Sequence, residues 1–119
     1  MKRNWDTIRK IMLRVEQLPD EGSTITPDDM TGMDSECAFY HMRLLIESGL
    51  AMGGSVELTG GGNAWISRLS WDGHELLDKI RSDTAWNKIK ETARIKGIDL
   101  CVDAVKAIAG IALARMVQG

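Results

Sequence analysis

The chain has 119 residues, of which 44% are hydrophobic and 27% charged, and its formal net charge is −2. This composition is typical of one folded domain with a packed core, and it excludes disordered and collagen-like chains. The most apolar segment, residues 107–114, is too short to span a bilayer, which needs roughly 20 residues.

The start of the chain does not resemble a signal peptide, because no apolar core follows its basic residues. We therefore expect a cytoplasmic protein whose two cysteines, Cys37 and Cys101, are reduced thiols.

The first element expected is an amphipathic helix over residues 4–18, because apolar residues from Trp5 to Leu18 recur at helical spacing. Its other face carries Arg9, Lys10 and Arg14, and Pro-Asp-Glu-Gly at 19–22 ends it. Residues 23–25 predict a short strand. The Thr-Pro pair at 26–27 predicts a short helix with proline at its first position.

The next segment predicts a helix followed by a hairpin. The helix, Asp34–Ser48, begins at an aspartate cap and ends before Gly49, which suits a left-handed residue. Two strands, 50–58 and 64–69, flank a tip at 60–63, and the glycines at 53–54 predict a bulge or an early bend. This order is typical of a winged helix, with Asp34–Ser48 as recognition helix and Glu57–Ser67 as wing.

We therefore predict a mainly α fold with a small antiparallel β-hairpin. A winged-helix (winged helix-turn-helix) domain is expected over residues 1–82, with further helices over 83–119. The last helix, Asp99–Val117, is apolar nearly all round and must be buried. It completes the core, forms a homodimer interface or lies on a membrane surface, and we favour the dimer. The expected interface residues are Val105, Ile108, Gly110, Ile111 and Ala112.

Charge is unevenly distributed along the chain. Residues 1–18 carry a net +3, residues 19–60 a net −7 and residues 61–119 a net +2. Arg43 is the one basic residue of the acidic middle, which contains the candidate recognition helix. Contacts to phosphate need lysine and arginine, so this distribution opposes simple DNA binding by a monomer. A dimer would double the number of cations.

Two functions fit these patterns. The leading one is a non-enzymatic regulator that binds DNA as a dimer through Ser35, Tyr40, Arg43 and Arg68, with Lys2 and Arg3 on the DNA backbone. The alternative is a module that binds a bacterial protein and so inhibits or redirects a host complex, including a defence complex. Its expected contacts are Asp28, Asp29, Asp34, Glu36 and Glu47.

Catalytic and metal sites have weak support in the sequence. Gly60–Gly62 precedes a strand and has no nearby lysine, so it is a turn and not a phosphate loop. Cys37 and His41 offer only two metal ligands. His74 can pair with Asp78 on a helix, but no nucleophile, base and oxyanion donor come together. We expect no enzyme activity, cofactor or metal.

The tryptophans are candidates for stacking on bases. Trp65 stands beside the wing tip and is the one we expect to be exposed. Trp5, Trp71 and Trp86 lie on apolar stripes or near helix starts, and we expect them in the core.

Six short segments of the chain resemble a known family. They are residues 1–3, the pairs Tyr40-His41, Leu44-Leu45 and Gly49-Leu50, residues 68–78 (Arg-Leu-Ser-Trp-Asp-Gly-His-Glu-Leu-Leu-Asp) and residues 84–88 (Thr-Ala-Trp-Asn-Lys). Together they resemble the domain-of-unknown-function family 2513 of phages, prophages and bacteria, over nearly the whole chain and least after Gly97. The resemblance implies a small bacterial or phage-borne cytosolic protein of winged-helix-like architecture, so we expect the regulator to be a phage or prophage protein. It transfers no catalytic residue.

Overall fold

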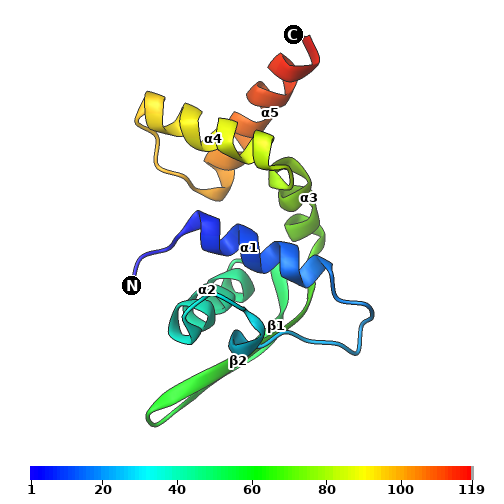
Figure 1. Cartoon of the computed structure of the whole chain (residues 1–119), viewed down its shortest axis with the longest axis vertical. Helices are drawn as coiled ribbons and strands as arrows, with labels where there is room; N and C mark the ends of the chain where they lie inside the picture. The colour runs from blue at the N-terminus through cyan, green and yellow to red at the C-terminus, as the bar shows by residue number, and fades with distance from the viewer. Residues whose placement is uncertain (119) are drawn as a thin grey trace. The chain divides into compact units, whose positions relative to one another are not determined.

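The computed structural model describes residues 1–118, with the backbone alone for residues 112–118. This part of the chain is mainly helical, with five α-helices, one 3-10 turn and one two-stranded antiparallel sheet (Figure 1). The elements are α1 (Trp5–Glu16), η1 (Pro27–Asp29), α2 (Ser35–Glu47), β1 (Ala51–Leu58), β2 (Gly61–Leu69), α3 (Trp71–Ile80), α4 (Asp83–Lys96) and α5 (Val102–Gln118).

The chain divides into two compact units, Met1–His74 and Glu75–Gly119. The division into these compact units falls inside α3, and the winged-helix domain expected over residues 1–82 stays a prediction.

Helix α1 begins at Asn4, whose side-chain oxygen accepts hydrogen bonds from the backbone amides of Asp6 and Thr7 at 2.9 and 3.2 Å. This caps two of the amides that a helix start leaves unpaired. The apolar stripe predicted from the sequence is the buried face of α1. Its buried residues are Trp5, Ile8, Ile11, Met12 and Val15.

The chain then returns to the hairpin before entering α2. Ile25 forms a single antiparallel bridge with Ile66 of β2, where we expected a short strand. Asp29 caps η1 by accepting a hydrogen bond from the backbone amide of Thr26 at 2.8 Å. Asp34 caps α2 through the amide of Cys37 at 3.2 Å. Gly49 follows α2 with a φ of 76°, so the expected cap and left-handed residue are both confirmed.

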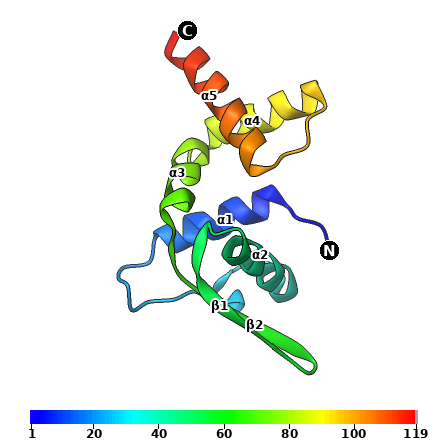
Figure 2. The ribbon, with the colours of Figure 1, turned by 180° about the vertical axis from the view of Figure 1, so that it is seen from behind.

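The hairpin is longer than expected, and its turn is tighter. β1 and β2 pair from Ala51 with Leu69 to Leu58 with Gly61, which leaves two residues, Thr59 and Gly60, in the turn. The predicted tip at 60–63 is therefore wrong, because Gly62 and Asn63 pair within the sheet. The predicted bulge is confirmed next to Gly53. In Figures 1 and 2 the turn projects away from α1 and α2.

The start of α3 is fixed to the base of the hairpin. The Ser70 hydroxyl donates to the carbonyl of Gly49 at 2.5 Å and accepts from the amide of Gly73 at 3.0 Å. A Cβ at Gly73 would lie 2.0 Å from the carbonyl oxygen of Leu50, so only glycine lets the helix approach this closely. The segment that most specifically carries the family resemblance thus has a structural role.

The second unit contains the pair α4 and α5, which pack on each other (Figure 1). Ser82 caps α4 and Gly97 ends it with a φ of 66°. On the surface of α4, the Arg94 guanidinium hydrogen-bonds Glu91 and holds the pKa of that carboxyl below its usual value. In the described part of the chain, no helix is both long enough and apolar enough to cross a membrane.

Candidate functional site

The outer side of α2 and the neighbouring strand β1 form the surface that sequence analysis singled out. We call it the α2–hairpin face and define it by Asp28, Glu36, Phe39, Arg43, Glu47 and Glu57. Four of these residues are acidic and one is basic. Ser35 lies beside them and is exposed, while Tyr40 is half-buried with its ring edge-on to His41 at 5.3 Å.

Arg43 is held by carboxylates of its own chain. Its guanidinium lies 2.5 Å from the Glu57 carboxylate on β1 and 3.7 Å from the Glu47 carboxylate one helical turn along α2. It also lies over the Phe39 ring, 5.6 Å from the ring centre. The sequence suggested Arg43 as a phosphate contact, but in this conformation its charge is already neutralised.

The acidic residues proposed for protein binding fall into two groups. Asp29 and Asp34 cap η1 and α2, so their carboxylates already accept backbone hydrogen bonds. Asp28, Glu36 and Glu47 are exposed and belong to the α2–hairpin face. Glu57, which the sequence did not single out, completes this face through Arg43.

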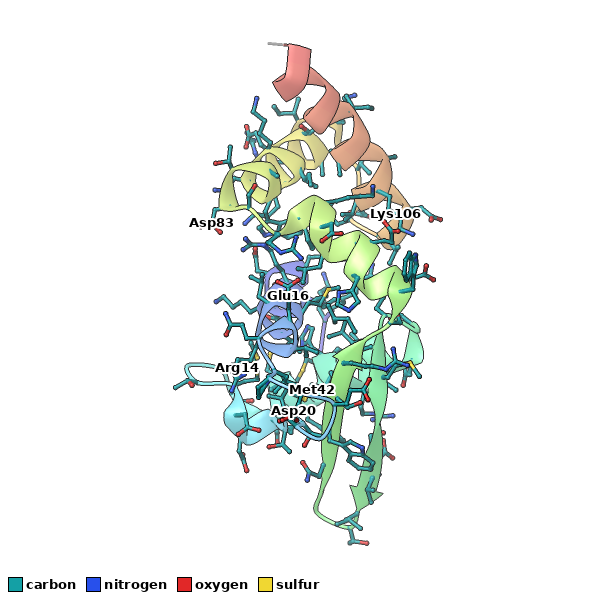
Figure 3. The ribbon with its side chains drawn as sticks, turned by 90° about the vertical axis from the view of Figure 1, so that its right-hand side faces the viewer. Arg14, Glu16, Asp20, Met42, Asp83 and Lys106 are labelled. Carbon is teal, nitrogen blue, oxygen red and sulfur yellow. The ribbon has the colours of Figure 1, made fainter. Side chains whose placement is uncertain are left out.

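Arg68 lies in different surroundings from Arg43. It lines a groove of about 280 Å³ with Asp20, Glu21 and His74, and its guanidinium donates to the Leu69 carbonyl at 3.4 Å. Figure 3 labels Asp20 in this region. His74 is exposed. Asp78, which the sequence offered as a partner for His74, forms an ion pair with Arg81 at 2.8 Å.

The basic residues near the N-terminus lie on or ahead of α1. Lys2 and Arg3 are exposed, and Arg3 lies over the ring of Trp5 at 5.5 Å. Lys10 and Arg14 line a groove of about 540 Å³ between α1 and the loop before α2. Arg14 is labelled in Figure 3.

His41 is a packing residue. It is 1% exposed, and its Nε2 accepts a hydrogen bond from the backbone amide of Asn4 at 2.9 Å. Its Nδ1 lies 2.8 Å from the carbonyl oxygen of Cys37, which requires the proton on Nδ1. Both ring nitrogens are therefore used within the fold. Among the described residues, no three His, Cys, Asp or Glu side chains are grouped to hold a metal ion.

A second groove crosses the α2–hairpin face between η1, the start of α2 and β2, and its volume is about 260 Å³. Phe39 forms part of it, and the tip of its ring touches β2 at Gly62. A Cβ at Gly62 would lie 2.8 Å from Phe39 Cζ, so glycine makes room for the ring. The lining residues are Pro27, Asp28, Ser35, Glu36, Phe39, Gly62 and Asn63.

Two tryptophans are exposed. Trp65 is 38% exposed, as expected beside the hairpin turn. Trp71 is 78% exposed, which corrects the expectation that it is a core residue. Trp71 occupies the first position of α3, just outside the apolar stripe. Its place at a helix start near an apolar run was therefore not enough to predict burial.

The expected oligomer interface is only partly on the surface. Val105 and Ile108 are 0% and 5% exposed, which places them in the core of the chain. Gly110 and Ile111 are exposed, Ile111 by 48%. Ala112 lies outside the residues whose side chains the structure describes.

Comparison with known proteins gives the family. The model of the family described as "Hypothetical protein (DUF2513)" matches residues 2–99. The chain belongs to the DUF2513 family. The resemblance seen in the sequence is thus confirmed. A relative in Haemophilus influenzae strain Rd, described as "Uncharacterized protein", is 42% identical over 116 residues, which cover 98% of each chain. No solved structure matches this DUF2513 protein.

Proposed function

We propose that this DUF2513 protein is a non-enzymatic winged-helix module that binds a partner protein through the α2–hairpin face. The order of elements supports a winged helix: α1, a bridge at Ile25, η1, α2, then the hairpin β1–β2. The Ile25–Ile66 bridge is the pairing that the first strand of a winged helix makes with the second strand of its wing. In this arrangement α2 is the recognition helix.

The observation that carries the proposal is the pairing of Arg43 with Glu57 and Glu47. It leaves the recognition helix with no unpaired cation and the face with an excess of carboxylates. Such a surface repels phosphate and attracts a basic protein surface. A basic surface of this kind on a host protein commonly serves nucleic acid, so the module would compete there with DNA or RNA. A cytoplasmic host complex is the expected setting.

Reversing the charge of the face tests the proposal. Glu47→Lys with Glu57→Lys changes two exposed residues and turns the face from acidic to basic. The control, Asp72→Lys with Asp103→Lys, makes the same change of charge at exposed positions outside the face. Immobilised wild-type protein and control should retain the same protein from a Haemophilus lysate, and the reversed variant should lose it. Equal capture by all three would contradict the proposal.

A second candidate is a dimeric DNA-binding regulator with Ser35, Tyr40, Arg43 and Arg68 as contacts. The winged-helix order of elements favours it, and so do Lys10 and Arg14, which have no ion pair among the described residues. Replacing Arg43 and Arg68 together by alanine should abolish DNA binding under this hypothesis. Unchanged affinity for DNA in a mobility-shift assay would exclude these contacts.

The dimer itself is a proposal about α5. The exposed pair Gly110 and Ile111 is the part of the expected interface that remains available on the surface. Ile111→Lys should therefore convert a dimer to a monomer in light scattering coupled to gel filtration. A wild-type chain that elutes as a monomer at all concentrations would remove the dimer.

A further inference from the structure

The groove between η1, α2 and β2 has carboxylates on two elements. Asp28 lies on η1 and Glu36 in the first turn of α2, and both side chains are exposed. Neither carboxylate has a hydrogen bond or ion pair among the described residues, unlike Asp29, which is a cap. Two unpaired carboxylates at one groove favour a cationic occupant.

Phe39 gives the groove an aromatic wall. The ring is half-buried and held against the backbone of Gly62, where a side chain would collide with it. The protein already places a cation over this ring, since the Arg43 guanidinium lies 5.6 Å from its centre. An aromatic face attracts cations, and a guanidinium stacks on it with more contact than an ammonium does.

The size of the groove limits the occupant. Its volume of about 260 Å³ is below the roughly 300–1,000 Å³ of sites that enclose a drug-sized ligand. It is large enough for a single long side chain. The two carboxylates exclude an anion, so a phosphate or carboxylate group of a ligand does not fit.

We infer that this groove binds an arginine side chain presented by the partner protein. The inference rests on the proposed function, of which it specifies the contact. The planar guanidinium has five N–H donors, so it can donate to Asp28 and Glu36 while its face lies against Phe39. A lysine ammonium carries the same charge but lacks the flat face, so arginine is the preferred side chain.

The test is a titration of the ¹⁵N-labelled full chain, followed by NMR, with the peptide acetyl-Gly-Arg-Gly-amide. The same peptide with lysine or with uncharged citrulline in place of arginine serves as comparison. We expect shifts centred on the amides of Phe39, Gly62 and Asn63, weaker binding of the lysine peptide and none of the citrulline peptide. Equal shifts with citrulline, or shifts elsewhere on the chain alone, would overturn the inference.

Two variants and a control sharpen the result. Asp28→Asn with Glu36→Gln should raise the Kd of the arginine peptide about ten-fold or more, as expected when charge-assisted hydrogen bonds are lost. Phe39→Leu should remove the preference for arginine over lysine. Asp72→Asn with Asp103→Asn removes the same charge outside the groove and should leave the Kd unchanged. A control that weakens binding as much as the groove variant would show that net charge alone acts.

The inference and the proposed function fail in different ways. If the arginine peptide does not bind but Glu47→Lys with Glu57→Lys still abolishes partner capture, the groove assignment is wrong and the function stands. If the peptide binds in the groove but charge reversal leaves capture unchanged, the groove assignment stands and the proposed function is wrong.

Discussion

The two sides of α2 differ in what holds their residues in place. On the inner side, Ala38, His41, Met42 and Leu45 are almost fully buried, and His41 is bonded to the start of α1. On the outer side, Arg43 and its two glutamate partners are partly exposed, and only charge and one aromatic ring position them. The inner side therefore determines the fold, and the outer side is open to interaction.

Under the proposed function, this difference is how a recognition helix changes its class of ligand without a change of fold. The inner contacts would support a DNA-binding face equally well. The outer side is acidic because Glu57 of the neighbouring strand reaches Arg43. A single long-range ion pair thus removes the cation on which the DNA hypothesis most depends.

A substitution on the buried inner side of α2 should lower the free energy of unfolding more than any other change considered. Met42 is 0% exposed and lies in the interior of the first unit (Figure 3). Met42→Ala should lower the free energy of unfolding by about 2–5 kcal/mol, because lost burial and a new cavity add together. Urea denaturation followed by circular dichroism measures this change. A loss below about 1 kcal/mol would show that the inner side is loosely packed.

Loss of the hydrogen bond between His41 on α2 and Asn4 at the start of α1 should have the next largest effect on stability. His41→Leu removes the acceptor for the Asn4 amide and should cost about 1–3 kcal/mol, since a partly buried donor is left unpaired. Amide hydrogen exchange supplies a local readout. The Asn4 amide should exchange faster in the variant than in the wild type, and an unchanged rate would contradict the role assigned to His41.

Arg43→Ala should separate stability from binding. Because Arg43 is partly exposed, the variant should lose less than about 1 kcal/mol of unfolding free energy. It also frees Glu47 and Glu57, so the face becomes more acidic. Binding of the basic partner should be unchanged or tighter, whereas weaker binding to that partner would contradict the charge argument.

The smallest effect is expected for Glu47→Gln. The Glu47–Arg43 pair is 3.7 Å long, lies one turn apart on α2 and is exposed. Such pairs contribute only about 0.3–0.5 kcal/mol, so the urea midpoint should barely change. A loss above about 1 kcal/mol would mean that the outer side also contributes to the stability of the fold.

Local patterns in the sequence predicted much of the fold. Helical spacing placed α1 and α2, and cap chemistry placed Asp34 and Gly49, because these features depend on neighbours a few residues away. The position of the hairpin turn was wrong because strand pairing, rather than glycine content, determines where the ladder ends. The role of Gly73 depends on Leu50, which no local pattern connects to it.

The candidate site was less predictable than the fold. Glu47 stands four residues after Arg43 on a helix, so this pair could have been predicted. Glu57, the partner that makes Arg43 unavailable to DNA, lies on another element, β1, so its pairing with Arg43 could not be predicted from the sequence. The sequence also grouped Arg43 with Arg68, although the structure gives these two residues different neighbours.

The central claim is that the α2–hairpin face rejects DNA because it is acidic. The most direct measurement is fluorescence anisotropy of labelled duplex DNA at low and physiological salt, with wild-type protein and with Glu47→Lys, Glu57→Lys. The account predicts no binding by the wild type at either salt concentration and salt-sensitive binding by the variant. Salt-sensitive binding of DNA by the wild type, lost when Arg43 and Arg68 are replaced by alanine, would contradict it.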